Sequence, residues 1–238
     1  MAKMETPAHI EIASLREKQV HDVDLMAPGP GTPWENRGSL GTVGSFFKTA
    51  GAMMFKPSQT YAMLSRPNAT GDGKSFVFIC SFFWSLAVIT HAIVMVIRSP
   101  EPIDPTGDLM GHFIFVIAAP FIFIGLLAIA RNIFSTLVES ELKKGTPKSL
   151  AANVFAYAAA PSIIAPLVVP LNWAIGVAVV WLWIALIATA GARSRMRLSF
   201  GGGLIAVFLG VFVVGVIIAG GWFGLIWVLG SLLTMGNA

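Results

Sequence analysis

The chain has 238 residues, of which 55% are hydrophobic and only 12% are charged, and its formal net charge is +4. The charged share is about half that of an ordinary soluble domain, and a soluble fold of this size could not bury so much apolar surface. The composition therefore excludes a typical soluble domain and predicts an integral membrane protein. Long unbroken apolar runs favour helices over a transmembrane barrel, whose strands alternate over about 10 residues. The predicted fold class is all-α, a polytopic membrane helical bundle.

Residues 1–33 are predicted to be a polar head followed by a linker. Residues 27–33 are rich in proline and glycine, which interrupt regular structure. No apolar stretch typical of a signal peptide opens the chain, so we expect insertion to begin at the first spanning segment. We expect much of this head to be disordered.

Residues 34–74 are predicted to form cytoplasmic helices at the membrane interface. Apolar side chains recur at helical spacing over residues 39–55, with Lys48 within the run and Lys56 after it. The run is too short and too polar to span a bilayer, so we expect an amphipathic helix whose apolar side faces the membrane. A cytoplasmic helix packed on the spanning segments is the alternative, and the sequence leaves both open.

Five segments that follow are apolar and of suitable length for a core of about 30 Å at about 1.5 Å per residue. They cover residues 75–97, 110–133, 150–171, 173–191 and 203–219. Residues 220–238 form an apolar tail that we expect at the outer interface. The loops after the second and fourth segments are rich in lysine and arginine, whereas those after the first and third are not. The positive-inside rule therefore predicts a cytoplasmic N-terminus and an external C-terminus.

The third segment carries Pro161, Pro166 and Pro170, and we expect a kinked helix at the centre of the bundle. Each proline lacks an N–H and crowds the carbonyl four residues earlier, so backbone acceptors are freed beside Tyr157 and Ser162. Broken helices of this kind line solute paths in transporters, which makes a small permease or channel the alternative function. Prolines are also common in spanning helices for packing alone, and we favour packing because no other broken, charged segment accompanies this one.

The chain lacks the side-chain patterns that enzymes need. Paired carboxylates, a serine–histidine pair or a set of metal ligands on one face would be expected for hydrolysis or transfer, and none is evident. His91 stands alone in the first segment, and a hydrogen-bonded neutral imidazole is the favoured interpretation. Arg131 ends the second segment, where a snorkelling side chain is favoured over a partner among freed carbonyls or anionic lipid. We therefore predict no enzyme activity, no cofactor and no metal site.

Basic and aromatic side chains on the cytoplasmic side form the predicted surface for lipids or partners. Each cation could gain about 1 kcal/mol near an anionic leaflet. The expected partners are membrane lipids, anionic at the cytoplasmic face, and a protein partner or a second copy of the chain, but no nucleic acid. The residues of this surface are Trp34, Phe46, Phe47, Lys48, Lys56, Lys143, Lys144, Arg193, Arg195 and Arg197.

Several parts of the chain follow one another in the order of a known membrane family. They are Pro33-Trp34-Glu35, a phenylalanine-rich helix with Thr49, Lys56-Pro57 ahead of Tyr61, five spans, and Tyr157-Ala-Ala-Ala-Pro161 in the third span. Together they resemble the bacterial branch of the Yip family, whose eukaryotic members interact with Ypt/Rab GTPases. The resemblance covers approximately residues 34–219.

The resemblance implies a five-span protein with a cytoplasmic N-terminus, placed in the bacterial inner membrane, without established chemistry. The Asp-Leu-Tyr-Gly-Pro signature of eukaryotic members is absent before Ser75, so Rab binding is not transferred to this chain. Asp108-Leu109-Met110-Gly111 looks similar but follows the first span, and we interpret it as coincidence. The sequence thus predicts a non-enzymatic protein that acts in membrane organisation or as a scaffold, with residues 34–64 as its active surface.

Overall fold

The computed structural model describes residues 29–65, 70–98, 108–138, 148–211 and 213, and every regular element within these ranges is a helix. The all-α fold class is therefore confirmed for the described part of the chain. The predicted head before residue 29, Lys143, Lys144 and the predicted tail 220–238 lie outside these ranges. In chain order the helices are α2 (Arg37–Leu40), α3 (Thr42–Phe55), α4 (Pro57–Ala62), α5 (Thr70–Arg98), α6 (Asp108–Leu137), α7 (Lys148–Ala158), the 3-10 helix η2 (Ala160–Ile164), α8 (Ala165–Val168), α9 (Trp173–Met196) and Phe200–Val211.

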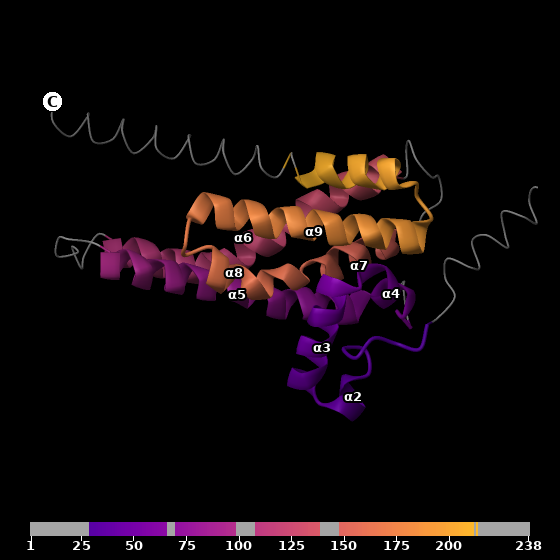
Figure 1. Cartoon of the computed structure of the whole chain (residues 1–238), viewed down its shortest axis with the longest axis horizontal. Coiled ribbons are helices and arrows are strands. Elements are labelled where there is room, and N and C mark those ends of the chain that lie inside the picture. The colour runs from indigo at the N-terminus through magenta and orange to yellow at the C-terminus, as the bar shows by residue number, and fades with distance from the viewer. Residues whose placement is uncertain (1–28, 66–69, 99–107, 139–147, 212, 214–238) are drawn as a thin grey trace, which may run out of the picture.

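Four helical stretches are long and apolar enough to cross a membrane, and they lie side by side as a bundle (Figure 1). They are Gly71–Arg98, Val116–Leu137, Ser149–Val168 and Trp173–Met196. The chain is thus an integral, multi-pass membrane protein by length and composition of its helices. Phe200–Val211 is a shorter apolar helix that covers the first part of the predicted fifth span, and most of the remainder of that span lies outside the described residues.

The third span is the centre of the bundle, as the sequence predicts. It buries 67% of its most apolar stretch inside the protein, against 28% and 22% for the first and second spans. The outer faces of those two spans carry exposed side chains such as Ile97 and Phe121, which suit a hydrocarbon surrounding. The first and second spans therefore present most of their surface outward, whereas the third is enclosed by protein.

The third span is broken into three pieces rather than bent as one kinked helix. Pro161 lies in the first turn of η2 and Pro166 in the first turn of α8, where a missing N–H leaves no hydrogen bond unmade. Pro170 lies in the turn of residues 169–171, directly before Asn172. The side-chain oxygen of Asn172 accepts a hydrogen bond from Ile175 N at 3.1 Å and so caps the start of α9.

The backbones of the third span and α9 come into close contact at Gly176. A Cβ added at Gly176 would lie 2.5 Å from Val169 Cα and 2.7 Å from Val168 O, both backbone atoms. Only glycine fits such a contact, because no side-chain rotation relieves it. Gly176 therefore sets the spacing of the hairpin that the third span forms with α9.

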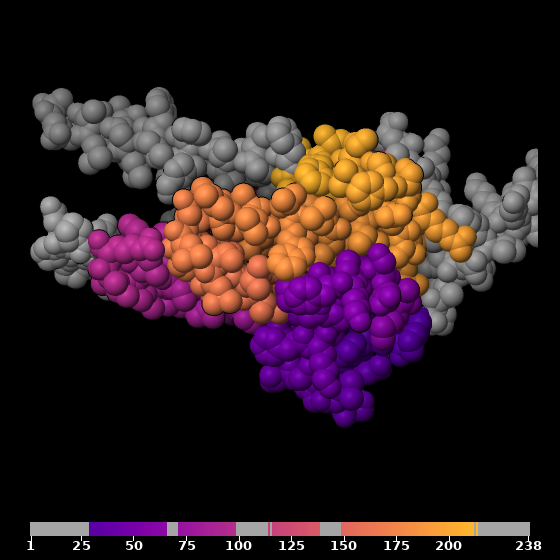
Figure 2. All heavy atoms as spheres, in the orientation of Figure 1, coloured from indigo at the N-terminus to yellow at the C-terminus, as the bar shows by residue number. Residues whose placement is uncertain are grey.

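Residues 29–65 form a lobe that projects from the side of the bundle, at the end where α5 begins and α9 ends (Figure 2). The lobe packs through α3 on η2 and α7, and through α4 on α9. The predicted single helix over residues 39–55 is divided at Gly41, whose φ of +80° favours glycine and separates α2 from α3. The sequence left open whether this segment lies in the membrane interface or packs on the spans. The structure shows that it packs on the spans.

Candidate functional site

The lobe begins with a reciprocal capping turn at Thr32-Pro33-Trp34-Glu35. Thr32 Oγ1 accepts a hydrogen bond from Glu35 N at 3.3 Å, and Glu35 Oε2 accepts one from Thr32 N at 2.7 Å. This is the reciprocal pattern of a capping box, which here closes the turn of residues 33–36 ahead of α2. Threonine three residues before glutamate is the pattern in the sequence that marks this turn.

Glu35 also ties the start of the lobe to its end. Its two carboxylate oxygens each accept a hydrogen bond from Ser65 N at 3.2 Å. Beside this contact, Gly29 N donates to Leu64 O at 2.9 Å, and Gly31 N donates to Met63 O at 2.7 Å. The segment before α2 and the segment after α4 are therefore held together by backbone and carboxylate bonds.

Trp34 lies at the junction of the lobe and the first span, with only 2% of its surface exposed. Its backbone N–H donates to Thr49 Oγ1 at 2.8 Å, and its indole Nε1 donates to Asp72 O at 2.9 Å. Its ring meets Phe46 and Phe76 edge-on, both at a centroid distance of 6.0 Å. Trp34 thus links α3 to the first turn of α5.

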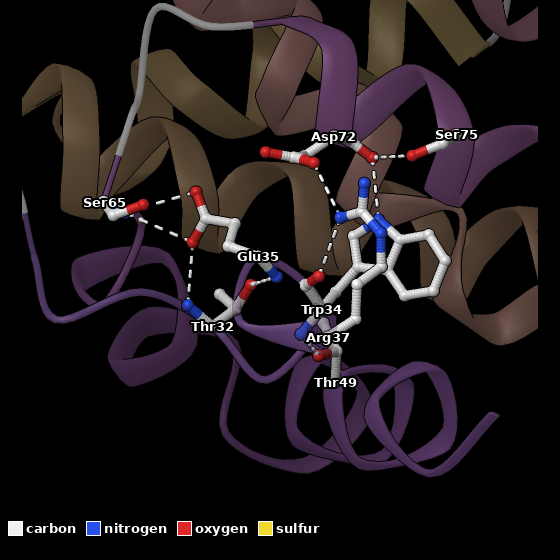
Figure 3. Close-up of polar contacts among 8 residues, drawn as sticks. All are labelled: Thr32, Trp34, Glu35, Arg37, Thr49, Ser65, Asp72 and Ser75. Atoms are coloured by element: carbon white, nitrogen blue, oxygen red, sulfur yellow. Dashed lines mark hydrogen bonds and ion pairs between the residues drawn. The ribbon is translucent and has the colours of Figure 1, made fainter. Parts of the chain in front are cut away.

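Arg37 packs on Trp34 and bonds to Asp72 at this junction (Figure 3). Its guanidinium lies 4.6 Å from the centroid of the Trp34 ring, and Nη1 donates to Trp34 O at 2.9 Å and to Asp72 Oδ1 at 2.7 Å. Asp72 stands in the first turn of α5, where a negative charge also complements the helix dipole. We call the group of Thr32, Trp34, Glu35, Arg37, Thr49, Ser65 and Asp72 the clasp.

Arg195 fixes the second half of the lobe to the last described span. Its side chain is 6% exposed, with Nε donating to Tyr61 O at 2.6 Å and Nη2 donating to Ala62 O at 3.1 Å and Leu64 O at 2.9 Å. These carbonyls lie at and just after the end of α4, where Tyr61 O also accepts from Leu64 N at 3.2 Å and Leu64 O also accepts from Gly29 N. Arg195 therefore acts as a C-terminal cap from a distant helix.

Tyr61 attaches the same helix, α4, to α7. The ring is fully buried, and its hydroxyl donates to Val154 O of α7 at 2.6 Å. A Cβ added at Gly191 would lie 2.7 Å from this ring, so α9 needs glycine where Tyr61 packs. Burial, and to a smaller extent the neighbouring Tyr157, raise the pKa of Tyr61 well above its ordinary value.

The predicted lipid or partner surface divides into buried and exposed members. Trp34, Phe46 and Arg195 lie inside the protein, because α3, α4 and the spans cover them. Their prediction as surface residues is therefore wrong: Trp34 and Phe46 pack in the core, and Arg195 caps α4. Five predicted members are exposed on the described part of the chain: Phe47, Lys48, Lys56, Arg193 and Arg197.

An apolar ridge runs along the outer side of α2 and α3. It comprises Leu40, Val43, Phe47 and Phe55, which are 52%, 71%, 51% and 74% exposed. The opposite side of α3, with Phe46, Ala50 and Met53, is buried against the bundle. The sequence suggested one apolar side, whereas α3 is apolar on both sides.

The ridge lies beside the spans rather than beyond their ends. Phe46 stacks on Phe83 at 6.1 Å, and Phe55 meets Trp183 at 6.3 Å. Phe83 is about 18 Å along α5 from Gly71, and Trp183 is about 20 Å along α9 from Met196. The helix α3 also contacts η2 in the middle of the third span. A bilayer around the spans would therefore surround the ridge with lipid.

The residues predicted to line a path in the third span are packed. Tyr157 is 1% exposed and meets the ring of Phe76 at 5.1 Å, while Ser162 is fully buried and accepts a hydrogen bond from Trp84 Nε1 at 3.2 Å. Thr90 Oγ1 lies 3.1 Å from Pro166 O, one of the carbonyls that the prolines free, and 3.0 Å from both Leu86 O and Ala87 O, so one hydroxyl proton serves three acceptors. Pro161, Pro166 and Pro170 are buried as well.

The described residues contain no group of three or more His, Cys, Asp or Glu placed to hold a metal ion. His91 lies 5.1 Å from Trp173, ring centroid to ring centroid, at the end of the bundle away from the lobe. Comparisons with protein-family models, curated proteins and solved structures gave no match.

Proposed function

We propose that this chain is a non-enzymatic membrane protein of Yip-family type that organises the membrane or serves as a scaffold for protein partners. The observation that carries the proposal is the ridge of Leu40, Val43, Phe47 and Phe55. Apolar side chains gathered on a surface that is held firmly in place are typical of an interaction site. The clasp and Arg195 hold this ridge on the spans from two directions.

The lobe is proposed to lie on the cytoplasmic side of a bacterial inner membrane, with the C-terminus outside. Exposed cations gather at the end of the bundle where α5 begins and α9 ends, among them Lys74, Arg193 and Arg197, and positive charge favours the cytoplasm. In a Cys80→Ser chain, Arg197→Cys should react with an impermeant maleimide only after the cells are permeabilised, whereas Arg98→Cys, at the opposite end, should react in intact cells. The reverse pattern would refute the orientation.

The Yip-type assignment is supported by the positions that carry the resemblance. Trp34 bonds to Thr49, Tyr61 bonds to Val154 one turn before Tyr157, and Pro161 opens η2, so these positions meet at one junction. A functional exchange tests the assignment: a bacterial Yip-family protein should replace this chain in its own host. Failure of several well-expressed family members to do so would count against it.

A permease or channel is the weaker proposal, because Tyr157 and Ser162 are buried and the hydroxyl of Thr90 lies within hydrogen-bond distance of Pro166 O. A flux assay on proteoliposomes tests this ranking. Solute or ion flux that Ser162→Phe abolishes would reverse it.

The scaffold proposal is tested by a cross-linked pull-down from native membranes with matched variants. Val43→Ser/Phe47→Ser removes apolar surface from the ridge, and Leu171→Ser/Ile175→Ser removes similarly exposed surface at the opposite end of the bundle. We expect a defined protein, or a second copy of the chain, to be lost with the ridge variant and kept with the control. Identical captured proteins for both variants would contradict the proposal.

A further inference from the structure

A pocket of about 610 Å³ opens between α5, α6 and α7, on the same end of the bundle as the lobe. Its volume is within the range of about 300–1,000 Å³ that is usual for small-molecule sites. A Cβ on Gly73 would lie 2.7 Å from Asn153 Oδ1, so α5 and α7 are in close contact beside the pocket. The pocket is lined by Lys74, Val77, Phe78, Ile124, Leu127, Ala128, Arg131, Asn132, Ser135, Ser149, Ala152, Asn153, Phe155 and Ala156.

The lining changes from charged to apolar along the direction of the spans. Lys74 and Arg131 lie near the end of the bundle, as do the polar side chains of Ser135 and Ser149. Val77 and Phe78 follow one helical turn deeper along α5, and Ala128, Leu127 and Ile124 lie one to two turns deeper along α6. Seven residues from Arg131 to Ile124 correspond to about 10 Å. The pocket therefore has a cationic mouth above an apolar wall.

The charge at the mouth is positive, and among the described residues no acidic side chain lines the pocket. Arg131 donates from Nε at 3.1 Å and from Nη2 at 2.8 Å, both to the neutral Asn132 Oδ1. Within the described ranges, neither Lys74 nor Arg131 forms an ion pair. Two cations from different helices thus face one opening, and the described lining adds no carboxylate to it.

We propose that this pocket binds an anionic phospholipid, with its phosphate at Lys74 and Arg131 and the upper part of its acyl chains along Phe78, Ile124 and Leu127. A guanidinium and an ammonium, here from Arg131 and Lys74, are the usual partners of phosphate oxygens. A zwitterionic ethanolamine headgroup would bring its ammonium next to two cations. The inference rests only on the membrane location and is independent of the scaffold role of the lobe.

Native mass spectrometry of the full chain in mild detergent tests the site, with phosphatidylglycerol and phosphatidylethanolamine of matched acyl chains as probes. We expect one tightly bound phosphatidylglycerol. Lys74→Gln/Arg131→Gln should weaken it about 30-fold, or about fivefold for each cation removed. The control Lys56→Gln/Arg193→Gln removes two exposed cations outside the pocket and should change binding less than about threefold.

Three outcomes would overturn the proposal. Equal binding of the two lipids would remove the role of headgroup charge, and an equal loss in the control variant would indicate diffuse surface attraction. Competition by glycerol phosphate at the same concentration as the lipid would indicate a small-anion site instead. A melting curve for each variant checks folding. Ala152→Phe fills the pocket with both cations kept, and should also release the lipid.

Discussion

At the scale of single residues, Arg195 bonds inside the protein although it was predicted to lie on the surface for lipids or partners. Its neighbours Arg193 and Arg197 were predicted for the same surface, and both are exposed. Arg195 instead caps α4 through carbonyls more than 130 positions away in sequence. Spacing along the chain could not reveal this contact, because it depends on where α4 packs.

Arg195→Ala should destabilise the folded chain by about 3 kcal/mol, because it leaves three carbonyls at the end of α4 without their charged donor. Arg193→Ala is the control, since Arg193 is exposed and contacts only the face of the Phe200 ring at 5.4 Å within the described residues. Its cost should stay below about 1 kcal/mol. Unfolding in mixed micelles measures both, and equal costs would refute the capping role.

Tyr61 makes the stability of the lobe sensitive to alkaline pH. Its pKa in the folded chain is raised above the value of about 10 expected for an unfolded chain, so the folded chain holds the phenol proton more tightly. The corresponding stability is complete below about pH 10 and is lost as the pH rises further. The chain has two tyrosines, so Tyr157→Phe leaves Tyr61 as the only tyrosine reporter.

In this Tyr157→Phe chain, tyrosinate absorbance should rise only well above pH 10, together with release of the lobe. The detergent-denatured chain serves as reference and should titrate near 10. A folded chain that titrates like the denatured one would show that Tyr61 is accessible to water and would contradict its docking between α7 and α9.

At the scale of elements, the sequence predicted where helices lie better than which side of them is buried. The four spans that the described residues contain were located to within a few residues by apolar length, and Pro161 and Pro166 marked the region of the break. Phe46 and Phe47 are neighbours, yet one is buried and the other half exposed. Because α3 carries apolar side chains on two opposite sides, periodicity could not decide which side packs on protein.

The hairpin between the third span and α9 depends on Gly176. Gly176→Ala places a Cβ against the backbone of Val168 and Val169, and overpacking of this kind should cost about 1–3 kcal/mol. Gly125→Ala, in α6, meets no atom within 4 Å and should be neutral or stabilising by up to about 1 kcal/mol. The midpoint of unfolding in mixed micelles distinguishes the two, and equal midpoints would contradict the close approach.

At the scale of the whole molecule, the lobe is held to the bundle by contacts that no local pattern specifies. The clasp joins residues 32–37 to Asp72, and Arg195 joins α9 to α4. Composition was enough to predict a helical membrane protein, since that property is summed over the chain. The sequence could not predict that α3 lies beside the spans. That position depends on contacts of this one helix with Phe83, Trp183 and η2, which are far apart in the sequence.

The depth of the ridge in the bilayer tests the central claim, that the lobe presents apolar side chains at the level of lipid. Spin labels at Val43, Phe47 and Phe55, one at a time in a Cys80→Ser chain reconstituted in vesicles, report their accessibility to oxygen and to a water-soluble nickel complex. Phe121→Cys on α6 is the lipid reference, and Ser199→Cys after α9 is the water reference. We predict that all three ridge labels resemble Phe121→Cys, with oxygen favoured over nickel. Ridge labels that resemble Ser199→Cys would contradict the account.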